Sequence, residues 1–190
     1  MNSKKLAGLF SIIIISILFF VNLFLGRYEL FSYMIIPLFA LAFMFWSDKF
    51  YNYSLFIIWS FCIWAILHIV GGIYFSGIRL FDLILIPLIG EPYNILRYDQ
   101  VLHVFCSIIL GMISYTIVSK YIKRKIWVIF LIAALISVGI GNLNEIAEFS
   151  VVVFFANNGI GDYFNNALDL VANLLGTLLG VLIMHKRYKR

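Results

Sequence analysis

Long apolar runs separated by short polar stretches dominate the chain. Six runs are long enough for a helix to cross a hydrocarbon core ~30 Å thick, which needs ~20 residues. They cover about 6–26, 29–47, 54–76, 100–119, 126–149 and 166–185. This pattern predicts an all-α membrane protein, a six-transmembrane helix bundle that forms a single integral membrane domain over residues 1–190.

The stretch between the third and fourth spans, residues 77–99, holds a further apolar piece. This piece, Leu83 to Ile89, is too short to span, and Pro87, Gly90 and Pro92 interrupt it or follow it closely. We therefore expect a short interfacial segment, either a helix or a cap over the external mouth of the bundle.

Basic residues predict the orientation of the spans. Eleven of the 14 Lys and Arg residues lie in the two termini and the loops around 48–53 and 120–125. The alternate loops hold only Arg27, Arg79 and Arg97. Because cytoplasmic loops carry the excess of Lys and Arg, both termini are predicted to be cytoplasmic, in a multi-pass protein of the cell (plasma) membrane.

Composition agrees with a membrane protein and argues against nucleic-acid binding. The chain is 64% hydrophobic and 12% charged, whereas soluble domains carry roughly 25% charged residues. Its net charge of +5 comes from short basic clusters between apolar spans, so we expect membrane lipids as partners and no nucleic acid. Cys62 and Cys106 lie in apolar runs without metal-binding spacing.

Most of the acidic residues fall on the predicted external side, and several lie inside apolar helices. Ionisable groups at membrane depth are costly and mark functional sites by default. On three helices, an acidic residue shares a face with a second polar residue three or four positions away. These pairs are Asp99 with His103, Glu145 with Glu148, and Asp169 with Asn173. His68 and Asp162 flank them at a similar predicted depth.

The residue types in this predicted pocket suit acid–base or metal chemistry. Two carboxylates on one helix face repel each other unless a proton, a cation or a basic group lies between them. We predict catalytic roles for the residues Asp99, His103, Glu145, Glu148 and Asp169, of which the predicted metal ligands are His103, Glu145, Glu148 and Asp169. Substrate-binding roles are predicted for His68, Asp162 and Asn173. The cofactor would be a divalent metal ion whose identity the sequence does not fix.

Three short elements within residues 65–185 resemble those of VanZ-like membrane proteins. They are Arg97-Tyr98-Asp99-Gln100-Val101-Leu102-His103-Val104-Phe105, Asn144-Glu145-x-x-Glu148 and Asp169-x-x-x-Asn173-x-x-Gly176-x-x-x-Gly180. Two further elements, Leu67-His68-Ile69-Val70-Gly71-Gly72-x-Tyr74 and Gly161-Asp162, are similar to YjdF-type proteins. The chain departs from these patterns at Glu148, and at Asn165 and Asn166. VanZ-like proteins are associated with teicoplanin resistance, so the resemblance implies envelope or lipid-linked chemistry.

Three functions fit these residues. The first is a metal-assisted membrane hydrolase or transferase acting on a lipid or lipid-linked envelope substrate. The second is a cation- or proton-coupled transporter, since transporters use intramembrane carboxylates for coupling. The third is a non-enzymatic membrane protein that binds a lipid or a partner, in which the polar cluster holds the helices together.

Overall fold

The computed structural model describes residues 3–91, 93–123, 125–154 and 163–188. It divides into two compact units, Met1–Phe81 and Asp82–Arg190, and each is described by itself. Six α-helices are found in the described residues, and the only strands there form one short hairpin. The all-helical class is therefore confirmed, whereas the single domain over 1–190 stays a prediction.

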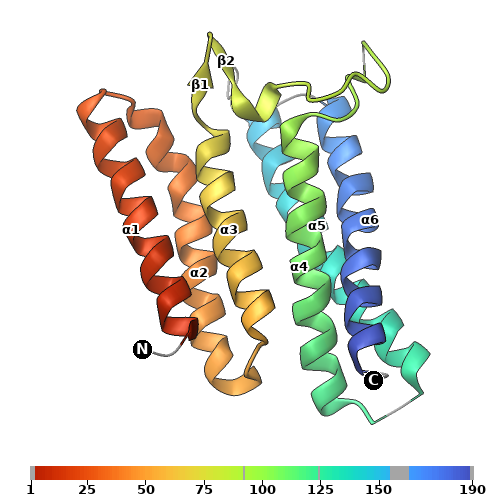
Figure 1. Ribbon diagram of the computed structural model, residues 1–190. Coiled ribbons are helices and arrows are strands. Elements are labelled where there is room, and N and C mark those ends of the chain that lie inside the picture. Colours follow the sequence, from red (N-terminus) through yellow and green to blue (C-terminus); the bar gives the residue numbers. More distant parts are fainter. Residues whose placement is uncertain (1–2, 92, 124, 155–162, 189–190) are drawn as a thin grey trace. The chain divides into compact units, whose positions relative to one another are not determined.

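The first unit contains three helices (Figure 1): α1 (Ser3–Phe24), α2 (Ser32–Tyr51) and α3 (Leu55–Gly71). A single turn of 3-10 helix, η1 (Tyr28–Phe31), precedes α2. Asn52 ends α2 in the left-handed conformation, and the Ser54 hydroxyl accepts a hydrogen bond from the Ile57 amide at the start of α3. Lys4 on α1 donates to Asp48 on α2 at 2.8 Å, which fixes the ends of these two helices to each other.

A β-hairpin follows α3. Its strands are β1 (Tyr74–Phe75) and β2 (Ile78–Arg79), with Tyr74 opposite Arg79. The two turn residues, Ser76 and Gly77, both have positive φ, as a two-residue hairpin turn requires. A short 3-10 helix, η2 (Leu80–Asp82), follows the hairpin and contains the boundary between the two units.

The second unit contains α4 (Tyr98–Tyr121), α5 (Ile126–Phe154) and α6 (Tyr163–Tyr188). Figure 1 shows these helices running alongside one another, with α4 and α6 in front. The glycines of α6 allow its close approach to α4, because a Cβ on Gly176 would meet the Val104 carbonyl oxygen and one on Gly180 would meet that of Ile108. Gly176 and Gly180, four residues apart on α6, therefore form a helix-packing surface.

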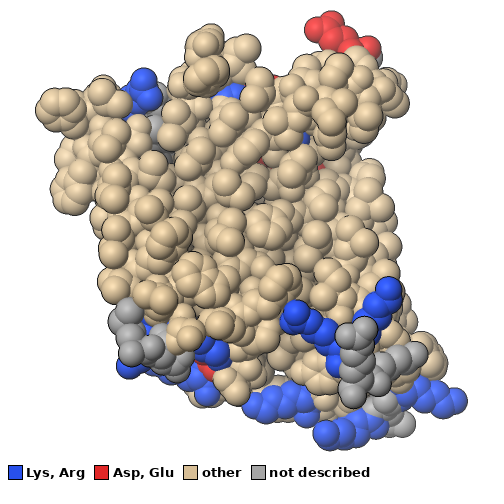
Figure 2. Space-filling view, in the orientation of Figure 1, with Lys and Arg blue, Asp and Glu red and all other residues tan. Residues whose placement is uncertain are grey.

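Five of the described helices are long and apolar enough to cross a membrane, namely α1, α2, α4, α5 and α6. The sixth, α3, is equally apolar but has 17 residues. Multi-pass membrane insertion is thus supported, while six spans and cytoplasmic termini stay predictions. In the second unit, Lys and Arg side chains gather where α4 and α6 end (Figure 2), which agrees with that orientation.

The segment between the third and fourth spans was expected to form either a helix or a cap, and its described apolar residues 83–89 form no α-helix. The described residues from Leu83 to Arg97 are irregular, and Ile84 pairs with Arg97 in an isolated antiparallel bridge. The Tyr98 amide also donates to the Leu83 carbonyl at 2.9 Å, which closes the segment into a loop at the start of α4. Pro87 breaks the helical pattern here because proline lacks a backbone N–H donor, and Gly90 disfavours a helix because of its conformational freedom. A cap over the bundle stays a prediction.

Candidate functional site

Polar side chains line the inner faces of α4, α5 and α6 near one end of the second unit. They recur at intervals of three or four residues, so each helix presents them on one face. The stripes are Asp99, His103 and Ser107 on α4; Glu145 and Glu148 on α5; and Asn165, Asp169 and Asn173 on α6. Helix packing brings the three stripes together inside the unit.

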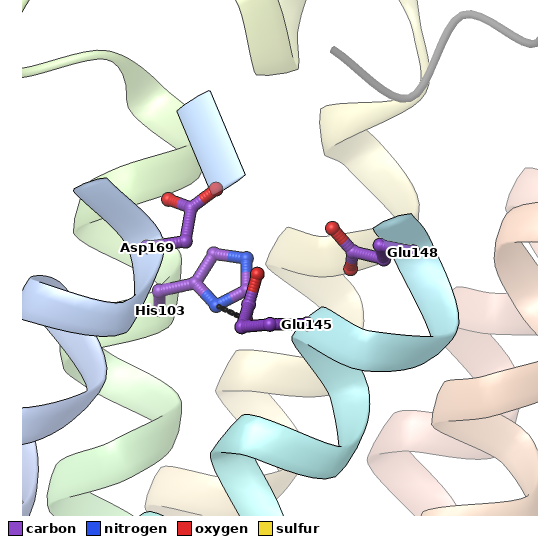
Figure 3. Close-up of side chains that lie close together, drawn as sticks. All are labelled: His103, Glu145, Glu148 and Asp169. Carbon is purple, nitrogen blue, oxygen red and sulfur yellow. Dashed lines mark ion pairs between the residues drawn. The ribbon is translucent and has the colours of Figure 1, made fainter. Parts of the chain in front are cut away.

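Four of these residues form the centre of the cluster: His103, Glu145, Glu148 and Asp169 (Figure 3). One potential ligand atom from each lies within 4.8 Å of those of the others. In the view of Figure 3, the His103 ring lies between Asp169 and Glu145, and Glu148 stands one turn further along α5. Asp169 and Glu145 are buried at 0% and 2% exposure, so water does not solvate their carboxylates.

The His103 ring has a carboxylate at each nitrogen. Its Nδ1 lies 3.1 Å from Glu145 Oε1, and its Nε2 lies 3.6 Å from Asp99 Oδ1. A ring held in this way is fixed in orientation, because turning it would break both contacts. Either nitrogen can donate to one carboxylate while the other serves as a base or as a ligand.

Asn173 holds the Glu145 carboxylate in place. Its amide nitrogen donates to Glu145 Oε1 at 2.9 Å, and its carbonyl oxygen accepts from the Ser107 hydroxyl at 2.7 Å. A Cβ on Gly141 would lie 3.1 Å from the Asn173 side chain, so the glycine leaves the space that the amide occupies. One residue of α6 is therefore tied to both neighbouring helices.

Asn165 has a similar role for the carboxylates of Asp169 and Asp99. Its amide nitrogen donates to Asp169 Oδ2 at 2.7 Å and to Asp99 Oδ2 at 3.1 Å. Its carbonyl oxygen faces the Arg97 guanidinium, with Nη1 at 3.4 Å. The second oxygen of Asp169, Oδ1, is buried without a hydrogen-bond partner among the described residues. A buried acceptor in this state is costly, so it requires an explanation.

Two amides support the glutamates of α5. Asn144 donates to Glu148 Oε1 at 2.7 Å, and Asn166 donates to Glu145 Oε2 at 3.2 Å. Glu145 thus has a neutral donor on each oxygen besides its contact with His103. These bonds hold the carboxylates in place without neutralising them.

The cluster carries an excess of negative charge. Four carboxylates, including Asp99, face one imidazole, and in the described part of the second unit their ion pairs are those with His103. Two unit charges ~4 Å apart interact by about 4 kcal/mol at the effective dielectric constant typical of proteins. The acids therefore need protons or a bound cation in order to lie this close together.

The structure brings six of the predicted site residues together: Asp99, His103, Glu145, Glu148, Asp169 and Asn173. His68 lies on α3 in the first unit, where its ring packs against Trp64 and Phe81 at centroid distances of 5.5 and 5.3 Å. Asp162 lies outside the described residues. The substrate-binding roles of His68 and Asp162 stay predictions.

Sequence reasoning did not assign roles to Ser107, Asn165 and Asn166, although each contacts a predicted site residue. A signal for each of them was present. Ser107 follows His103 by four residues, Asn165 precedes Asp169 by four, and Asn166 precedes Asp169 by three. The spacing does not reveal which residue of the neighbouring helix Asn166 contacts.

The chain belongs to a family described as predicted membrane protein (DUF2238), whose model matches residues 6–190. This match supports the membrane nature of the whole chain. Comparisons with curated proteins and with solved structures give no significant match. The more specific likeness to VanZ-like and YjdF-type proteins stays a prediction.

Proposed function

We propose that the cluster in the second unit binds a divalent metal ion and that the protein is a metal-assisted membrane enzyme. The observation that supports this most strongly is the convergence of His103, Glu145, Glu148 and Asp169 from three helices. Imidazole and carboxylate ligands suit Zn²⁺, Mn²⁺ or Fe²⁺. A cation would offset the negative charge that these residues bring together.

The residues present fit such an ion. Asp169 Oδ1 is a buried acceptor without a partner among the described residues, and it belongs to one of the four candidate ligands. Ligands ~2.1 Å from an ion lie at most ~4.2 Å apart, so the spread of 4.8 Å requires only a small inward shift of the side chains. The neutral donors Asn144, Asn165 and Asn173 would hold the carboxylates in position through hydrogen bonds.

The chain supplies the remaining groups that a hydrolase or transferase needs. A bound ion would supply Lewis-acid activation of water or of a substrate oxygen. Asp99 is held at Nε2 of His103 and by Asn165, outside the four candidate ligands, so it is placed to accept a proton. Asn173 orients Glu145, and Ser107 orients Asn173.

The predicted orientation places this cluster toward the external leaflet. The cluster is close to the ends of its helices, as Asp99 lies in the first turn of α4. A lipid headgroup would occupy the same depth. We therefore propose a lipid or lipid-linked envelope substrate and a site in the cell membrane.

Metal titration of the purified, chelator-treated protein tests this function. We expect Asp169→Asn and Glu148→Gln to weaken binding of Zn²⁺ or Mn²⁺ by at least tenfold, since each removes a charged ligand. Ser137→Ala is the matched control, because it removes a buried hydrogen bond to Thr177 without touching the cluster. Equal metal affinity in all three variants and the unaltered protein would refute the metal site.

One alternative also has support in the structure. The dense hydrogen bonding around Asn173 and Asn165 would serve a cluster that only holds the helices together. If the cluster has only this structural role, Asp169→Asn and Glu148→Gln should lower thermal stability without changing metal affinity. Transport has less support, because α4 and α6 pack closely at Gly176 and Gly180 and leave no space between them there.

A further inference from the structure

We propose that Arg97 and Gln100, at the start of α4, bind the phosphate group of a membrane lipid beside the metal cluster. The loop that precedes them would contact the apolar part of the same lipid. This inference rests on the proposed function in that it takes the cluster as the reaction centre. It adds the class of substrate, a lipid that carries a phosphate ester.

Arg97 is the guanidinium tied most directly to the cluster. Its Nη1 lies 3.4 Å from Asn165 Oδ1, and the amide nitrogen of the same Asn165 contacts both Asp99 and Asp169. An anion held by Arg97 would therefore lie about one side chain away from the candidate metal ligands. Guanidinium groups recognise phosphate through paired N–H donors, which lysine cannot reproduce.

Two donors at this position have no acceptor among the described residues. They are Arg97 Nε and Gln100 Nε2, and both are buried. Gln100 is only 6% exposed, and its oxygen is already used by the Leu96 and Arg97 amides, at 2.7 and 3.2 Å. The side-chain nitrogen of Gln100 is thus left with a hydrogen to donate, at the positive end of the α4 dipole. Oxygens of a phosphate group would satisfy both donors if the side chains opened to admit it.

The loop before Arg97 is apolar and exposed. Its most exposed large side chains, at more than half of their area, are Ile86, Leu88 and Ile89. Their backbone is irregular, and irregular backbone cannot lie in the hydrocarbon core exposed to lipid. The loop therefore suits the interface, where apolar side chains enter the lipid and peptide groups stay hydrated. Tyr93 of the same loop packs on Phe164 of α6 at 5.5 Å, which keeps the loop at the cluster's end of the unit.

Charge and polarity together favour a lipid phosphate over a soluble anion. The four acids of the cluster repel an anion that approaches alone, so affinity must come from Arg97 and from apolar contact. A soluble phosphate lacks the apolar contact, whereas a phospholipid supplies both. The Ile84–Arg97 bridge joins the base of the loop to Arg97, so a single amphiphile could reach both.

Binding of a short-chain lipid to the full-length protein tests the inference. Dihexanoyl phosphatidic acid would be titrated by calorimetry into detergent-solubilised protein, and inorganic phosphate would be titrated separately. Each titration would be run with EDTA and again with Zn²⁺. We expect Arg97→Gln to weaken lipid binding by tenfold or more, as for loss of a charged hydrogen-bond pair. Arg27→Gln is the matched control, since it removes another predicted external charge. Leu88→Ser should weaken binding of the lipid but not of inorganic phosphate.

The outcomes separate this inference from the proposed function. Unchanged lipid affinity in Arg97→Gln, with normal size-exclusion and melting profiles, would overturn the phosphate site. Equal affinity for inorganic phosphate and for the lipid would overturn the lipid assignment. Arg97-dependent lipid binding that Zn²⁺ does not change would support the site while counting against the metal cluster. Metal binding without lipid binding would do the reverse.

Discussion

Replacing Asn173 by Asp separates a metal site from a purely structural network. The substitution keeps the size and shape of the side chain, so packing against Gly141 is preserved. It exchanges the amide donor 2.9 Å from Glu145 Oε1 for a carboxylate oxygen. The cluster then gains another acid at the point where α5 and α6 meet.

The size of the effect follows from this geometry. Loss of a hydrogen bond to a charged acceptor costs about 1.5–3 kcal/mol. Two negative charges 2.9 Å apart would add up to about 6 kcal/mol at the usual effective dielectric constant. A shared proton removes most of that repulsion, so we expect a net loss of about 3 kcal/mol in metal-free protein. For a chain of this size that corresponds to a fall of about 6–12 °C in melting temperature.

Metal should reduce the loss of stability in Asn173→Asp. The added carboxylate raises the negative charge available to a cation, so Asn173→Asp should bind Mn²⁺ or Zn²⁺ more tightly than the unaltered protein. Melting of both proteins in EDTA and in saturating metal measures this directly. The stability deficit of the variant should shrink on metal addition. A deficit that stays the same with and without metal would refute the reasoning and favour a structural network.

The remaining predictions concern packing and topology. Gly176→Ala should destabilise the protein by more than 2 kcal/mol, because the new Cβ would collide with the Val104 carbonyl oxygen. Gly139→Ala on α5 has open space around it and should instead stabilise the helix by up to ~1 kcal/mol; melting of the two variants would contradict the packing account if they shifted alike. For topology, a cysteine at Glu91 should react with an impermeant thiol reagent in intact cells, and a cysteine at Lys123 only after lysis. Labelling in the opposite order would invert the orientation.

Much of the cluster could be predicted because its signal is local. Polar residues are rare in apolar helices, and a spacing of three or four residues places them on one face. The pairing of Asp99 with His103 and of Glu145 with Glu148 needed no tertiary information. The four-residue spacing of Gly176 and Gly180 on α6 is likewise local, since small residues at this interval permit close helix contact.

Other features depend on how the helices are rotated against one another. The contact of Asn166 with Glu145 crosses from α6 to α5, so its partner cannot be read from the spacing along α6 alone. The bridge of Asn165 between Asp99 and Asp169 also requires the register of α4 against α6. The segment 77–99 was expected to form either a helix or a cap, and the Ile84–Arg97 bridge within it is a non-local pairing that local spacing does not reveal.

X-ray absorption at the metal edge of the purified protein tests the central claim most directly. The account predicts one bound divalent ion per chain, with a first shell of oxygen and nitrogen ligands at about 2.0–2.2 Å. The signal of one imidazole should be present and should disappear in His103→Ala. A folded protein without stoichiometric metal, or an imidazole signal that survives in His103→Ala, would contradict it.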